Sequence, residues 1–176
     1  PAHPRSAGHV TGVFEAGGHG RIEAVFYGVH AAAGRVAVAR ANSAPKAAGG
    51  VDAVVFDYDR TGERFVPVRV VGTEARAKTV SEIPISVALT EDGRGLYVGY
   101  GVLVGELAYV RVDSPAAEIV HGDFGAVMDI APVGDAAYVA VTALGLPGAD
   151  VGMLRRVTMD DGVLRDRSIV SHRGST

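Results

Sequence analysis

The chain has 176 residues, 48% of them hydrophobic and 21% charged, and a formal net charge of −3. This balance excludes a disordered chain, and the absence of basic runs argues against nucleic acid as the main partner. No apolar run reaches the roughly 18 to 20 residues of a membrane-spanning helix, so we expect a soluble protein. The absence of cysteine excludes disulfides, thiolate nucleophiles, Cys-ligated zinc, iron–sulfur centres and covalently attached haem on this chain.

Short strands are predicted from residue 21 onwards, after a Gly- and Pro-rich segment at 1–20 that predicts an extended arm or an edge strand. Apolar segments of five to eight residues then alternate with Gly, Asp and Pro clusters, which is typical of an all-β protein. The expected strands are Ile22–Val29, Arg35–Arg40, Ala53–Tyr58, Phe65–Val71, Ile85–Leu89, Leu96–Tyr100, Leu107–Val112, Ala117–Val120, Val127–Ala131, Ala137–Val141, Met153–Met159 and Leu164–Val170.

Composition supports the same fold class. Val is the commonest residue, with 29 copies against 8 Leu, and the 24 Gly are about twice the usual share. Val favours strands and Gly favours turns, whereas helical proteins rely on Leu, Glu and Lys. The Ala-rich segment at 41–50 contains Pro45, Gly49 and Gly50, so we expect a loop excursion there and not a helix.

The twelve predicted strands form an internal repeat. The segment Pro84–Asp113 aligns with Gly125–Gly162, and the second strands of successive units are spaced 60 and 41 residues apart, the longer spacing absorbing the 41–50 loop. Four antiparallel strands in roughly 40 to 50 residues is the spacing of a β-propeller blade. The repeat predicts three blades within residues 21–176, at about 21–72, 73–122 and 123–172.

The middle repeat carries a family resemblance. Its sequence Pro84-Ile-Ser-Val-Ala-Leu-Thr-Glu-Asp-Gly-Arg-Gly-Leu-Tyr-Val resembles the bacterial YVTN/WD40-like β-propeller repeat, with Glu91-Asp92-Gly93 as a positive-φ turn. Thr90-Glu91 replaces the Ser-Pro of that family, and the third repeat keeps Tyr138-Val139 but not the turn motif. The resemblance implies a propeller fold and leaves the activity open, since such propellers serve as lactonases, redox-enzyme domains and binding scaffolds.

Three blades do not close a ring, because propellers have four to eight. An open arc would leave two apolar blade faces bare. We therefore expect a second polypeptide, missing sequence or copies of this chain to complete the propeller. A closed β-barrel or a β-sandwich of about twelve strands is the alternative.

A candidate ligand-binding site is His121, Asp123 and Asp129, which the repeat places at a blade junction close to an innermost strand. A histidine beside a carboxylate can bind a metal ion or act as a base. The alternative is a loop histidine bonded to the backbone.

A candidate metal site is Asp57, Asp59 and Glu63, because carboxylate oxygens at short spacing suit calcium. The segment lacks the D-x-D-x-D-G loop pattern, so the alternative is that the two aspartates cap the turn and face water. No other cofactor is evident from the sequence.

No catalytic motif stands out. No serine lies in a G-x-S-x-G motif, and no helical pattern follows the Gly-rich segment at 17–21 to seat a phosphate. The first functional hypothesis is a scaffold that binds a protein or a ligand. The alternative is part of a lactonase-like or redox-associated propeller enzyme whose active site needs the rest of the ring.

The N-terminal residue is Pro1 and not Met, and residues 1–12 lack the apolar region of a signal peptide. These features and the C-terminal Ser-His-Arg-Gly-Ser-Thr segment lead us to expect a processed fragment. We expect a periplasmic or secreted protein whose signal peptide has been removed, with a cytoplasmic location as the alternative. The 15 Arg against 2 Lys favour a GC-rich bacterial source.

Overall fold

The computed structural model describes residues 24–42, 52–71, 84–101, 105–114, 119–142 and 150–173. These residues form twelve strands and no helix, so the predicted all-β fold class is confirmed. None of the described residues belongs to a helix long and apolar enough to cross a membrane. The predicted arm at 1–20 and most of the predicted loop at 41–50 lie outside the described residues.

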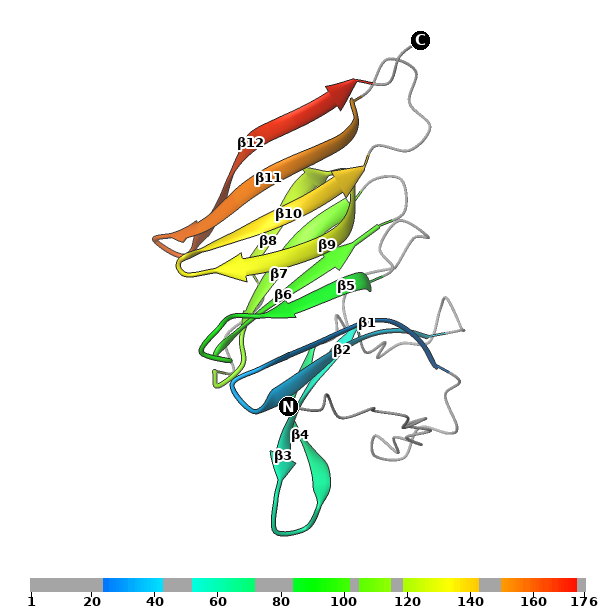
Figure 1. Cartoon of the computed structure of the whole chain (residues 1–176), viewed down its shortest axis with the longest axis vertical. Helices are drawn as coiled ribbons and strands as arrows, with labels where there is room; N and C mark the ends of the chain where they lie inside the picture. The colour runs from blue at the N-terminus through cyan, green and yellow to red at the C-terminus, as the bar shows by residue number, and fades with distance from the viewer. Residues whose placement is uncertain are drawn as a thin grey trace, which may run out of the picture.

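The strands form three antiparallel sheets of four strands, and each sheet follows chain order (Figure 1). Sheet A contains β1 (Ala24–Ala32), β2 (Arg35–Asn42), β3 (Ala53–Asp59) and β4 (Arg64–Val71). Sheet B contains β5 (Pro84–Leu89), β6 (Gly95–Tyr100), β7 (Gly105–Arg111) and β8 (Ile119–Phe124). Sheet C contains β9 (Ala126–Val133), β10 (Ala136–Thr142), β11 (Asp150–Asp160) and β12 (Val163–Arg173).

Tight turns join the strands because the sequence supplies residues that tolerate positive φ. Asp161 and Gly162, between β11 and β12, have φ of 48° and 76°, as a two-residue hairpin turn requires. Gly93 has φ of 69° and its N–H donates to the Thr90 carbonyl at 2.8 Å, so the predicted turn before β6 is confirmed. The turns β1–β2, β5–β6, β9–β10 and β11–β12 lie at one end of the stack, at the left of Figure 1.

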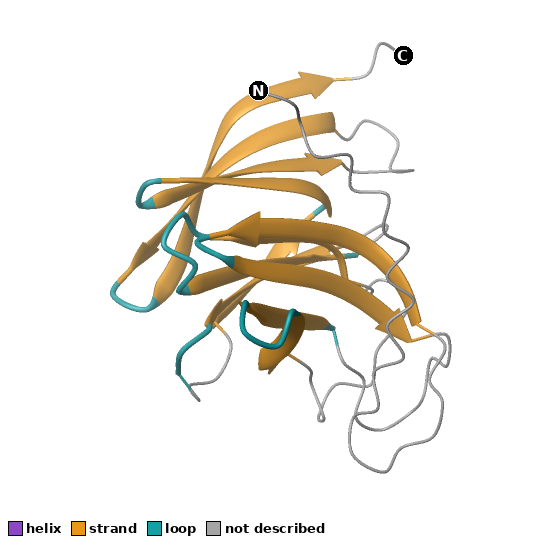
Figure 2. Cartoon of the chain, turned by 60° about the horizontal axis from the view of Figure 1, so that its bottom comes forward, coloured by secondary structure: helices purple, strands orange, loops and turns teal. Residues whose placement is uncertain are grey.

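The three sheets stack face to face in the order A, B, C, as Figures 1 and 2 show. The first strands make the central contacts: β5 lies against β1 and β2 on one side and against β9 on the other. Because both faces of sheet B are covered, every residue of β6 is buried. Burying apolar side chains on both faces stabilises the stack by about 25 cal/mol per Å² removed from water.

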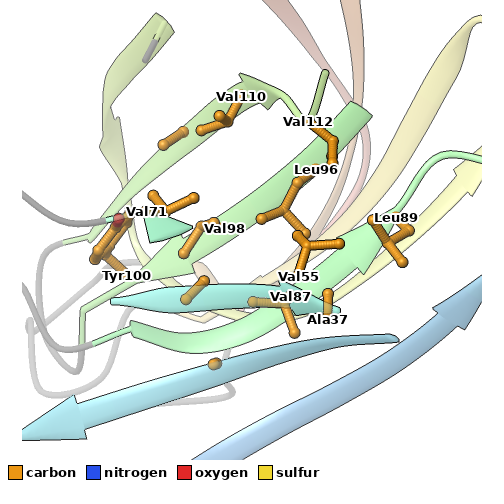
Figure 3. Close-up of a cluster of buried hydrophobic side chains, with 13 residues drawn as sticks. Ala37, Val55, Val71, Val87, Leu89, Leu96, Val98, Tyr100, Val110 and Val112 are labelled. Carbon is orange, nitrogen blue, oxygen red and sulfur yellow. The ribbon is translucent and has the colours of Figure 1, made fainter. Parts of the chain in front are cut away.

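Two apolar clusters fill the interfaces. The cluster between sheets A and B (Figure 3) consists of Ala37, Ala39, Ala53, Val55 and Val71 of sheet A with Val87, Leu89, Leu96, Val98, Tyr100, Ala108, Val110 and Val112 of sheet B. The cluster between sheets B and C consists of Ala88, Tyr97, Leu107, Val127, Ile130, Ala137, Val139, Val141, Val157 and Leu164. Sheet A contributes mainly alanines, so its backbone approaches sheet B closely.

The sheets differ from the sequence-based expectations at two points. None of the three sheets is closed, since each has two end strands, and the alternative of a closed barrel is therefore wrong. The boundary expected at residue 122 falls within β8, and sheet C begins at Ala126. The reason is that β8 stays paired with β7 as far as Phe124, opposite Gly105.

Candidate functional site

An open pocket of about 430 Å³ lies at the turn end, between sheets A and B. Its lining residues come from the β1–β2 turn, the end of β3, the β5–β6 turn and the segment after β7, namely Ala33, Gly34, Arg35, Asp57, Tyr58, Asp92, Arg94 and Asp113. Three carboxylates and two guanidinium groups make this surface strongly polar. The pocket is the candidate functional site of the described chain.

Arg35 is the central side chain of the pocket. Its Nε donates to Asp57 Oδ1 at 2.8 Å, and its Nη1 donates to the Gly93 carbonyl at 2.8 Å. Its Nη2 lies 2.8 Å from Asp113 Oδ1. The hydrogen bond to Asp113 is the main cause that raises the pKa of Arg35. Burial lowers this pKa, and the hydrogen bond and charge of Asp57 raise it. Arg35 therefore remains a cation and connects sheet A to two segments of sheet B.

Asp92 is a second organised group in the pocket. Its Oδ1 accepts the Thr90 hydroxyl at 2.6 Å and the Arg94 N–H at 3.0 Å. The Thr90 hydrogen bond is the main cause that lowers the pKa of the Asp92 carboxyl. Asp92 is therefore an anion at neutral pH, on the exposed β5–β6 turn. The pocket presents fixed charges of both signs, which suits a polar ligand or a polar loop of a partner.

The sequence did not single out Arg35, although one signal was present. Strand pairing makes Arg35, Gly95 and Ala136 equivalent first residues of the second strand in sheets A, B and C. A charged residue where the other repeats have Gly and Ala departs from the repeat. Such a departure points to a contact specific to one sheet, and the ion pairs of Arg35 are such a contact.

Two of the three predicted calcium ligands have other partners, and the third, Glu63, is exposed in the β3–β4 turn. Asp57 is paired with Arg35. Asp59 accepts the backbone N–H groups of Thr61 and Gly62 at 3.0 and 3.2 Å, and its other oxygen lies 3.5 Å from Arg64 Nε. Asp59 therefore caps the turn, as the alternative interpretation had it. Within the described ranges no three His, Asp or Glu side chains are grouped to hold a metal ion.

The predicted ligand-binding residues lie on two different sheets. His121 and Asp123 belong to β8, the last strand of sheet B, where His121 pairs with Leu107. Their side chains lie outside the described part of the structure. Asp129 lies on β9, is exposed, and accepts its neighbour's N–H, that of Ile130, at 2.9 Å. β8 is the fourth strand of sheet B, and β9, which follows it directly in the chain, is the first strand of sheet C.

Comparison with known proteins adds no family assignment. No protein-family model matches the chain, and no curated protein matches its sequence significantly.

Proposed function

We propose that the chain is a three-blade segment of a β-propeller and acts as a scaffold that binds a protein or a ligand. Sheets A, B and C are the three blades, and further blades complete the ring. The pocket around Arg35 is the binding feature of the described turn end. Its three carboxylates outnumber its two guanidinium groups, which favours ligands that carry hydrogen-bond donors or positive charge.

The observation that carries this proposal is the repeated packing of the three sheets. Each sheet has the same strand order, and successive sheets contact each other through β1, β5 and β9. Side-by-side packing of four-stranded antiparallel sheets through their first strands is the packing of propeller blades. A stack of this kind has two end faces, one on sheet A and one on sheet C.

The end face of sheet A is apolar. Strand pairing aligns Val29, Val38, Val54 and Val70 in one row across the four strands. Val54 is buried, whereas Val29 and Val70 at the ends of the row are 71% and 47% exposed. Exposed apolar patches of this kind are typical of surfaces that bind another protein element. The row supports completion of the scaffold by further blades.

The test combines a hydrophobic dye, light scattering and metal analysis on the purified chain. We expect the chain to carry no stoichiometric metal and no visible chromophore, and to enhance the fluorescence of anilinonaphthalene sulfonate whenever it is monomeric. A monomer that leaves the dye fluorescence unchanged would contradict an open propeller segment. A stoichiometric metal or a chromophore would favour the alternative, a propeller enzyme.

A further inference from the structure

In the described structure, one face of sheet A and one face of sheet C have no neighbouring sheet. These two faces correspond to the two sides of the interface that recurs between sheets A and B and between sheets B and C. We call the face of a sheet that meets the preceding sheet its leading face, and the face that meets the next sheet its trailing face. Strand pairing identifies equivalent positions, because Val29 pairs with Val38, Val87 with Val98, and Ile130 with Val139. Val29, Val87 and Ile130 are therefore the same position on the leading faces of sheets A, B and C.

Among the described residues, the first strand of sheet A is exposed on its leading face, whereas the first strands of sheets B and C are buried there. Val87 and Ile130 are 7% and 4% exposed, whereas Val29 is 71% exposed. At the end of the third strand, Tyr58 is 46% exposed and its equivalent Val112, just after β7, is 4% exposed, whereas Val54 and its equivalent Ala108 are both buried. The leading face of sheet A thus carries apolar residues that a preceding sheet would bury.

The trailing face of sheet C shows the complementary pattern. Ala131 and Tyr138 pair on sheet C as Ala88 and Tyr97 pair on sheet B. Ala88 and Tyr97 are 0% and 3% exposed beneath sheet C, whereas Ala131 is exposed and Tyr138 is half-buried. The pair Ala-Tyr recurs at the position that meets the next sheet, so the trailing face of sheet C has the features of one that accepts a leading face.

We propose that a second copy of this chain is the occupant of both open faces. The trailing face of sheet C in each copy packs on the leading face of sheet A in the other, and two copies close a ring of six blades. This inference rests on the proposed function, because it needs the sheets to be propeller blades. A head-to-tail contact whose rotation closes generates a ring, and six blades lie within the range of known propellers.

The repeat also predicts which residues meet across the new interface. Gly28 packs on the next sheet, where an added Cβ would lie 3.3 Å from the Ser86 Cα and 3.4 Å from the Val87 N. Asp129 is the residue of sheet C equivalent to Gly28, since Gly28 pairs with Ala39 and Asp129 with Ala140. Asp129 of one copy should therefore lie opposite Val29 of the other, at a wider separation than Gly28 from Val87, because Asp129 has a side chain where Gly28 has none.

Cross-linking tests this contact directly, because the chain has no cysteine of its own. Copies carrying Val29→Cys are mixed with copies carrying Asp129→Cys and oxidised with copper phenanthroline. We expect a covalent dimer in the mixture and none from either variant alone. The control pairs Val29→Cys with Glu63→Cys, which lies in the exposed β3–β4 turn, and should give no covalent dimer. A dimer from Val29→Cys alone would overturn the head-to-tail arrangement.

Charge substitutions on the two faces provide the second test. Val29→Asp and Ala131→Asp change exposed residues, so each variant should fold as the unaltered chain does. In sedimentation the unaltered chain should be a dimer, and each variant alone should have a dissociation constant at least about tenfold higher. A mixture of the two variants should regain dimer, since one of its two interfaces then has neither substitution.

The outcomes separate this inference from the proposed function. Monomers at all concentrations that bind the dye would overturn the two-copy ring and leave the scaffold to be completed by other blades. Oligomers larger than a dimer would overturn ring closure by two copies. Monomers that do not bind the dye would overturn both proposals.

Discussion

The guanidinium of Arg35 lies 2.8 Å from the carboxylate of Asp113, across the interface between sheets A and B. The two residues are far apart in the chain, and Arg35 also holds Asp57 of its own sheet and the Gly93 carbonyl of sheet B. One side chain therefore joins two sheets at the end where the pocket opens. The pocket and the packing of the two sheets depend on the same contacts.

Replacing Arg35 with Ala should destabilise the protein by about 1–2 kcal/mol. The substitution removes charge-assisted hydrogen bonds from a side chain that is only 19% exposed, and the half-exposed aspartates recover part of the loss by hydration. Urea unfolding measures the change. Arg94→Ala in the same pocket is the matched control and should change stability by less than about 0.5 kcal/mol. Equal effects of the two substitutions would show that the Arg35 contacts contribute nothing.

Replacing Gly99 with Ala should cost about 1–3 kcal/mol, because an overpacked core strains its neighbours. An added Cβ at Gly99 would overlap the Ser86 hydroxyl and the Val127 side chain on the next sheet. Gly152→Ala is the control, since an added Cβ there has open space. Chemical denaturation of both variants checks the prediction, which fails if Gly99→Ala is as stable as Gly152→Ala.

Ser86 and Gly99 should show energetic coupling. The Ser86 hydroxyl donates to the Val127 carbonyl at 2.9 Å in a buried setting, so Ser86→Ala alone should cost about 1–2 kcal/mol. In the double variant the missing Ser86 hydroxyl removes one of the two overlaps of the new methyl group, and the overlap with Val127 remains. The loss of unfolding free energy in the double variant should therefore be smaller than the sum of the two single losses by about 0.5 kcal/mol or more.

A double-mutant cycle measured by urea unfolding tests this coupling. The control cycle combines Gly99→Ala with Arg35→Ala, which lies at another interface and should be additive within about 0.5 kcal/mol. Strict additivity in the Ser86 and Gly99 cycle would contradict the predicted overlap between the Ser86 hydroxyl and a methyl group at Gly99.

Stability should fall at high pH because of Tyr97. Burial is the main cause that raises the pKa of Tyr97 to about 12, with smaller contributions from Tyr109 and Asp135. The folded state therefore holds this proton more tightly than the unfolded chain, whose tyrosine pKa is about 10. The protonated Tyr97 therefore adds on the order of 2 kcal/mol to the free energy of unfolding. This stabilisation is complete below pH 10 and is lost as the pH rises towards 12.

Urea unfolding between pH 9 and pH 12 measures this loss. Tyr97→Phe should flatten the profile, whereas Tyr138→Phe leaves the contact between Tyr97 and Tyr109 intact and should retain the decline. A Tyr97→Phe variant that declines as steeply as the unaltered chain would contradict the assignment.

Strand periodicity and turn residues predicted most of the fold. All twelve expected strands occur, and Gly93 adopts positive φ where a turn was expected. The signal is local, because alternating apolar residues and a turn former suffice to specify a hairpin. The end of β8 was missed because Gly125 alone separates it from β9, too short a break for a turn signal.

The candidate site was predicted much less well. Asp57 was singled out, but as a calcium ligand, and Arg35 was not considered. The partners of Arg35 come from β3, the β5–β6 turn and the segment after β7. Nothing in the local pattern around Arg35 indicates which of the chain's acidic residues lies opposite, because that depends on how two sheets stack.

The linear chain determined the strands, the turns and the repeat, since these follow from residue preferences over a few neighbouring positions. The stacking order, the Arg35 contacts and the identity of the open faces depended on the three-dimensional arrangement. Val29, Val87 and Ile130 are equivalent apolar residues of three strands, and Val87 and Ile130 are buried because a preceding sheet packs on their strands, whereas Val29 is exposed in the described structure.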